Sequence, residues 1–187
     1  MAASDVFICN LALQALGQPA ITALTENSVA ARECNRCYEH LRDLLVTTHR
    51  WHFAEAQDQI AAESTAPSFG YAYAFPWPSD CLRPLPPNDY TLDWKMQGRK
   101  ILSDDSGPLD LIYLKRVTDT AQFPATFTQY LALKMAHHMC EKLTQSNTKK
   151  ASLAEDIREA RAEAKKANDF ADLSPEPPED AWISAMR

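Results

Sequence analysis

The sequence is poor in glycine and in clustered positive charge. Only four of its 187 residues are glycine, and none lies in a glycine-rich loop of the kind that cradles phosphates, so nucleotide binding is not expected. The 25 Asp and Glu residues outnumber the 19 Lys and Arg residues, which gives a formal net charge of −6. Because nucleic-acid binding draws most of its affinity from clustered cations, tight DNA binding is not expected either.

Long hydrophobic runs are also missing. No stretch approaches the roughly 20 apolar residues that cross a bilayer. The apolar N-terminal run contains Asp5 and has no cationic segment before it, which does not fit a secretory signal peptide. The five cysteines are an odd number in a chain large enough to fold without cross-links, so reduced thiols are expected. These features predict a soluble protein that is made in a cytoplasm and has no membrane partner.

Helical periodicity recurs in four parts of the chain. Apolar residues spaced by three and four positions, with capping residues at the ends, predict helices over residues 4–17, 27–49, 124–145 and 148–171. The third helix is apolar over most of its circumference, which predicts the central position in a bundle. The fourth has a narrow apolar seam and a charged remainder, which is typical of a helix with one side in solvent.

Two of these helices have faces that the spacing defines closely. For the second helix, the spacing predicts a buried face and an opposite face in water. The predicted buried residues are Ala30, Cys34, Cys37, Leu41, Leu44 and Thr48, and the predicted solvated ones are Arg32, Arg36, Glu39 and Asp43. For the fourth helix, the predicted seam is Leu153, Ile157, Ala160, Ala164, Ala167 and Ala171.

The segment between the second and third helices, residues 51–117, changes to a period of two. Aromatic residues alternate with small or polar ones in two runs, which predicts strands with one buried face. The runs are Tyr71, Tyr73, Phe75 and Trp77, then Tyr90, Leu92, Trp94 and Met96. Residues 109–116 are apolar on both faces and predict a central strand. Six of the twelve prolines lie between Pro67 and Pro87, which excludes a helix there and restricts strands to short or edge pieces.

The predicted fold class is therefore α+β. It is mainly an α-helical bundle of about four helices, with an inserted antiparallel β-rich lobe over about 51–117 and a single domain over 1–172. Residues 173–187 read LSPEPPEDAWISAMR, in which three prolines favour an extended path. We interpret this segment as a C-terminal arm whose apolar residues Trp182, Ile183 and Met186 bind a partner, because a buried aromatic anchor can dominate the energy of an interface.

Two motifs could hold a metal ion, and each has a simpler interpretation. Cys34 and Cys37 are one helical turn apart, as in half of a zinc site, but no second cysteine pair exists and both lie on the apolar face of the second helix. Packing in the core is the favoured interpretation. His137, His138, Cys140 and Glu141 offer nitrogen, sulfur and oxygen ligands.

Adjacent histidines point in different directions on a helix, so we interpret that second motif as a polar edge of the central helix. The aromatic run around Tyr73 lacks the interleaved cations of a base-stacking platform, which favours buried sheet residues. Asp104 and Asp105 are paired acids, as a glycosidase requires, but they lie in turn-like sequence. No cofactor is expected.

The order of the segments resembles the tail tubular protein A family of short-tailed phages. The residues that carry the resemblance are Asn10-Leu11-Ala12-Leu13, Leu16-Gly17-Gln18-Pro19-Ala20-Ile21 with Leu24, Arg50-Trp51-His52-Phe53-Ala54, Leu111-Ile112-Tyr113-Leu114-Lys115-Arg116 and Phe123-Pro124-Ala125-Thr126-Phe127. They are followed by the long charged helix to Asp169 and a short tail, so the resemblance covers most of the chain. Each piece is short, and the specificity lies in their common order and spacing.

The resemblance implies a helical bundle with a β-rich insertion and the role of a head-to-tail adaptor in the virion. It implies a closed ring of about twelve copies between the portal protein and the tail nozzle protein, with double-stranded DNA passing through the centre without specific binding. Members have no enzymatic active site. In this role the C-terminal arm with Trp182, Ile183 and Met186 is expected to contact the portal protein or a neighbouring copy. The negative net charge suits such a channel, because an acidic wall repels phosphate. A virion-associated cell-wall hydrolase and a DNA-binding module remain the alternatives.

Overall fold

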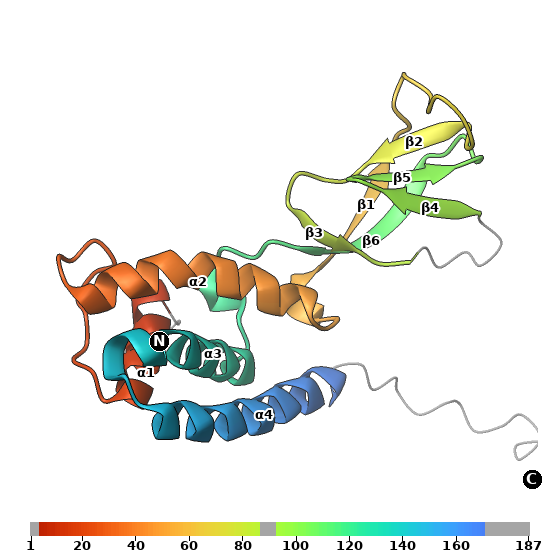
Figure 1. Ribbon diagram of the computed structural model, residues 1–187. Helices are drawn as coiled ribbons and strands as arrows, with labels where there is room; N and C mark the ends of the chain where they lie inside the picture. The colour runs from red at the N-terminus through yellow and green to blue at the C-terminus, as the bar shows by residue number, and fades with distance from the viewer. Residues whose placement is uncertain (1–3, 87–92, 171–187) are drawn as a thin grey trace, which may run out of the picture.

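The computed structural model describes residues 4–86 and 93–170, and it has two parts (Figure 1). The four helices form a bundle, and the strands form a lobe that stands off the bundle beyond the end of the second helix. The helices are α1 (Asp5–Leu16), α2 (Val29–Thr47), α3 (Ala125–Thr144) and α4 (Asn147–Phe170). The predicted α+β fold with four helices and an inserted β lobe is confirmed. The predicted arm, residues 173–187, lies outside the described residues.

Local capping sets the ends of the first two helices. At the start of α1, Ser4 accepts a hydrogen bond from the backbone N–H of Phe7 (3.1 Å), and Gly17 ends the helix in the left-handed conformation at φ 70°. The cap of α2 is Ser28, whose Oγ accepts from the N–H of Ala31 at 3.1 Å. The helix predicted over residues 27–49 therefore begins at Val29, slightly later than predicted.

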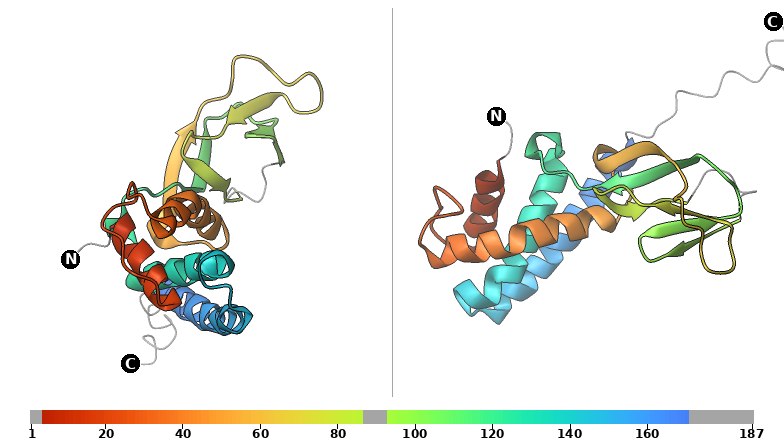
Figure 2. Two further views of the ribbon diagram at one scale, coloured as in Figure 1. Left: turned by 60° about the vertical axis from the view of Figure 1, so that its left-hand side comes forward. Right: turned by 90° about the horizontal axis from the view of Figure 1, so that it is seen from above.

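α3 is the central helix, as its broad apolar surface predicted. It packs against α1, α2 and α4, and Figure 2 shows it between α2 and α4. Its buried residues lie all around the helix and are Phe127, Thr128, Tyr130, Leu131, Ala132, Leu133, Met135, Ala136, Met139 and Cys140. Because α3 is covered on three sides, most of the solvent-exposed surface of the bundle belongs to the outer helices α1, α2 and α4.

α4 covers α3 with one narrow seam. Leu153, Ile157, Ala160 and Ala164 are buried as predicted, but Ala167 is exposed, and Ala171 lies outside the described residues. The seam advances by steps of four and three residues, and its next contact after Ala164 is made four residues later by Asn168. The apolar seam therefore ends in a polar contact with another part of the chain.

The face of α2 changes near its C-terminal end. The sequence predicted Leu44 and Thr48 on the buried face, but both are exposed, Leu44 to 44%. Arg42 is buried instead, because its guanidinium pairs with Asp43 (2.8 Å) and lies over the ring of Tyr38. Asp43 also accepts from the Nε of Arg116 at 2.7 Å, so this part of α2 contacts the segment that leads from the β lobe to α3.

The β lobe consists of two three-stranded antiparallel sheets. The first has the order β1-β6-β3 and the second β2-β5-β4. The strands are β1 (Glu55–Ile60), β2 (Tyr73–Pro76), β3 (Cys81–Pro84), β4 (Trp94–Gln97), β5 (Lys100–Ser103) and β6 (Leu109–Lys115). Short 3₁₀ turns at His52–Ala54 and Thr120–Gln122 lead into and out of the lobe. β6 is the central strand of its sheet, which confirms the interpretation of residues 109–116.

The lobe has a small hydrophobic core of its own. Its buried residues are Ile60, Phe75, Cys81, Ile101, Leu109, Leu111 and Tyr113. Among the described residues of the two aromatic runs, only Phe75 is fully buried, and Met96 is 38% exposed because β4 is an edge strand. Tyr90 and Leu92 lie outside the described residues. The described parts of the two runs thus contain β2 and β4, which are shorter than the predicted strands, and fewer of their residues are buried than the alternation predicted.

Candidate functional site

The residues that the sequence singles out for partner binding, Trp182, Ile183 and Met186, lie outside the described residues. The structure instead shows the surfaces that the rest of the chain presents and the positions of the other candidate residues. None of the helices within residues 4–86 and 93–170 is long and apolar enough to cross a membrane.

The paired cysteines pack in the bundle core. Cys34 is fully buried and its Sγ lies 3.8 Å from the sulfur of Met139 in α3, while the Sγ of Cys37 donates to the carbonyl oxygen of Cys34 at 3.6 Å. Burial raises the pKa of the Cys37 thiol to about 12, so it is protonated at neutral pH. Within the described part of the chain, the pair belongs to no group of three or more possible metal ligands, and packing is the role that the geometry supports.

The second metal motif does not converge on one point. Cys140 is buried and its sulfur lies 3.2 Å from the hydroxyl of Thr144, whereas His138 is exposed. Glu141 accepts from the Nζ of Lys150 in α4 at 3.0 Å. Burial, with Lys134 and Lys150 nearby, lowers the pKa of His137. Within the described ranges, no group of three or more His, Cys, Asp or Glu side chains is arranged to hold a metal ion.

The paired acids Asp104 and Asp105 shape the turn between β5 and β6. The Oδ1 of Asp104 accepts from the backbone N–H of Ala72 at 2.8 Å, and the Oδ1 of Asp105 accepts from the N–H of Gly107 at 3.1 Å. Both aspartates are exposed to solvent. Asp105 thus binds a backbone N–H of its own turn, whereas Asp104 binds a backbone N–H of the segment before β2.

The junction between bundle and lobe is a feature that sequence reasoning missed. We call residues 49–55 the neck. Trp51 is buried there against Phe127 of α3, with a distance of 5.2 Å between the ring centroids, and its indole N–H donates to the carbonyl oxygen of Leu45 at 3.0 Å. The guanidinium of Arg50 binds both carboxylate oxygens of Glu55 at 2.6 and 2.9 Å and lowers the pKa of that carboxyl group.

The last turn of α4 holds the neck. The side chain of Asn168 accepts from the backbone N–H of His52 at 3.0 Å and donates to the carbonyl oxygen of Arg50 at 2.9 Å. One amide therefore satisfies a donor and an acceptor of the neck backbone. The Nε2 of His49 lies 3.5 Å from a carboxylate oxygen of Asp169, and burial, together with Lys165, lowers the pKa of His49. The end of α4 is thus fixed beside the entry to the β lobe.

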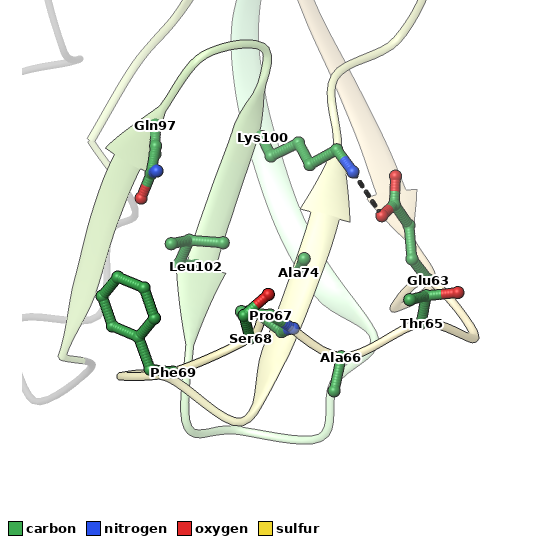
Figure 3. A pocket seen from close by; sticks show the side chains of 10 residues that line it. All are labelled: Glu63, Thr65, Ala66, Pro67, Ser68, Phe69, Ala74, Gln97, Lys100 and Leu102. Atoms are coloured by element: carbon green, nitrogen blue, oxygen red, sulfur yellow. Dashed lines mark hydrogen bonds and ion pairs between the residues drawn. The ribbon is translucent and has the colours of Figure 1, made fainter.

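A groove opens on the side of sheet β2-β5-β4 that faces away from the lobe core. We define the lobe groove by its lining residues, and its volume is about 320 Å³. They are Glu63, Thr65, Ala66, Pro67, Ser68, Phe69, Ala74, Gln97, Lys100 and Leu102. Figure 3 shows the ring of Phe69 rising from the loop before β2 beside Leu102, and the ammonium of Lys100 reaching Glu63. The sequence showed Phe69 only as an aromatic in a proline-rich loop, which gave no reason to select it.

Exposed apolar side chains also occur on the bundle. Phe7 on α1 is 50% exposed, and Val29 and Leu44 lie near the two ends of α2. Single exposed apolar residues are common on monomeric proteins, so each is a weak signal by itself. No protein-family model matches the chain, and no curated protein matches it.

Proposed function

We propose that the chain is a structural protein of a phage virion, a head-to-tail adaptor, and that it catalyses no reaction. The observation that carries the proposal is the chain order of the fold. The bundle is built from both ends of the described chain, α1 and α2 before the lobe and α3 and α4 after it. A helical bundle with a β lobe inserted between the second and third helices is the arrangement that the resemblance to the tail tubular protein A family implies.

In this role the chain forms a closed ring of about twelve copies between the portal protein and the tail nozzle protein. DNA passes through the ring without specific binding, which the formal net charge of −6 favours. A ring requires each copy to contact two neighbours. The half-exposed Phe7, Val29 and Leu44 lie on α1 and α2, two of the three outer helices of the bundle, and suit such contacts.

The alternatives receive less support from the geometry. A cell-wall hydrolase needs a protected acid, whereas Asp104 and Asp105 are exposed and accept hydrogen bonds from backbone N–H groups. A DNA-binding module needs a basic helix face. The longest helix, α4, instead mixes both signs on its exposed surface, where Arg158 pairs with Glu155.

Electron microscopy of the purified chain mixed with the portal protein of the same phage tests the proposal. We expect rings stacked coaxially on the portal. A chain that ends after Ser174 lacks Trp182, Ile183 and Met186, and we expect it to fold normally but to fail to join the portal. Unchanged joining by the shortened chain would remove the arm from the proposal. A persistent monomer that hydrolyses cell-wall material would contradict the adaptor role itself.

A further inference from the structure

The lobe groove combines an aromatic wall with an apolar floor. In the registers of the sheet, Leu102 of β5 lies opposite Ala74 of β2 and Lys95 of β4, so the three side chains share one face. Ala74 and Leu102 are buried at the bottom of the groove, whereas Phe69 is 89% exposed at its side. An exposed aromatic ring beside an apolar floor is suited to receive another large apolar side chain.

The rim of the groove carries two lysines, Lys95 and Lys100, and one acid, Glu63, which leaves an excess of one positive charge. The β4–β5 hairpin, from Trp94 to Lys100, contains three cations and no acid. Lys95 is exposed on the groove face, and Lys100 is 48% exposed, with its Nζ 2.6 Å from Glu63. Arg99 is engaged elsewhere: it donates to the carbonyl oxygen of Cys81 at 3.1 Å and lies over a tryptophan ring. Because Glu63 pairs with Lys100, Lys95 supplies the excess positive charge that a ligand in the groove would meet.

The chain itself contains a segment with the complementary chemistry. Residues 176–183 read EPPEDAWI, in which three acids precede a tryptophan and an isoleucine. We propose that the lobe groove binds this segment from the C-terminal arm of a second copy of the chain. Trp182 fills the space beside Phe69, and the acids at 179 and 180 lie against Lys95 and Lys100. This inference deepens the proposed ring assembly and rests on it for the presence of neighbouring copies.

The arm has the reach and the stiffness for contact with another copy. α4 ends at Phe170 beside the neck, and the twelve residues up to Trp182 span roughly 40 Å when extended. Prolines 175, 177 and 178 favour a straight spacer, which opposes a sharp return to the lobe of the same chain. Binding of one surface to a different surface of the next copy is a heterologous contact, and such contacts generate rings.

A complementation experiment with the full-length chain tests the proposal. One variant disables the groove, F69A with K95E, and the other disables the arm, W182A with D180K. Phe69 and Lys95 are exposed, so the groove variant is expected to keep its fold, which circular dichroism checks. The control is K166E, the same charge reversal on the exposed side of α4. Self-association is measured by sedimentation over a range of concentrations.

We expect the wild type and K166E to self-associate equally and each double variant to associate about tenfold or more weakly. An equimolar mixture of the two double variants should form a one-to-one heterodimer, because one retains an arm and the other a groove. A mixture that stays monomeric, or variants that associate like the wild type, would overturn the inference. Portal binding by the wild type is measured separately. A wild type that binds the portal supports the adaptor role even when the groove contact is absent, and a groove contact without portal binding supports self-association alone.

Discussion

At the residue scale, Asn10 ties the segment after α1 back to the helix. Its side-chain oxygen accepts from the N–H of Ile21 at 2.8 Å, and its amide donates to the carbonyl oxygen of Ile21 at 2.9 Å. Ile21 is buried, so N10A leaves two buried backbone groups without these partners. We expect N10A to lower the free energy of unfolding by about 1–3 kcal/mol, measured by urea denaturation.

The matched variant N10D keeps the acceptor but loses the donor. We expect it to be less stable than the wild type and more stable than N10A, because one of the two hydrogen bonds remains. If N10A unfolds at the same urea concentration as the wild type, the bonds to Ile21 do not stabilise the fold.

Single residues were predictable where apolar periodicity alone decides their surroundings. The helical spacing placed Cys34 and Cys37 in the core, and both are buried there. The same spacing failed for Arg42 and Leu44, because the burial of Arg42 depends on Asp43, which also accepts from Arg116 at 2.7 Å. That partner lies 73 residues further along the chain, beyond the reach of any local pattern.

At the element scale, Asn168 joins the end of α4 to the neck. Its two hydrogen bonds are to the backbone of Arg50 and His52, 118 and 116 residues away in sequence. N168A removes both bonds, while the buried seam up to Ala164 keeps the rest of α4 in place. We expect faster hydrogen exchange at the amide of His52 and in the last turn of α4, with little change in the middle of the helix.

The control for this prediction is K166A, two residues earlier on the exposed side of α4. It changes the same turn without touching the neck, so exchange at His52 should stay at the wild-type rate. Equal acceleration in both variants would show that the helix end frays on its own and that the neck is held by its other contacts.

Elements were easier to predict than the contacts between them. The four helices follow from spacing and caps, since Ser4 and Gly17 act within a few residues of chain. The lobe groove was not predictable, because its lining comes from a loop before β2 and from β4 and β5, which meet only through sheet pairing. A sequence pattern predicts which side of a strand is apolar, but it does not predict which loop lies over the opposite side.

At the scale of the whole molecule, the chain has two hydrophobic cores. The bundle core takes Leu114 from the last part of β6, and Leu82 and Leu85 pack against it from the lobe side. The lobe core lies further out along the same strand, around Leu111 and Tyr113. The lobe is entered through Glu55 and left through Leu114, and these two residues are direct partners in the β1–β6 register.

That pairing allows the lobe to be removed without separating the ends that it connects. A two-residue Asn-Gly turn fits between directly paired antiparallel residues, so it can replace residues 56–113 and join Glu55 to Leu114. We expect the shortened chain to keep its helical circular dichroism and a cooperative thermal transition, because the α1, α2, α3 and α4 packing is retained. Loss of Leu82 and Leu85 should lower its stability, each contributing up to about 1–3 kcal/mol.

The full-length variant L114A provides the comparison. Leu114 is fully buried in the bundle core, so truncating it should cost about 2–5 kcal/mol although the lobe is still present. If the shortened chain loses cooperative unfolding while L114A keeps it, the lobe is an integral part of the bundle's fold. If the shortened chain folds, it also shows whether the bundle alone binds the portal protein in the proposed assembly, because it lacks the lobe groove.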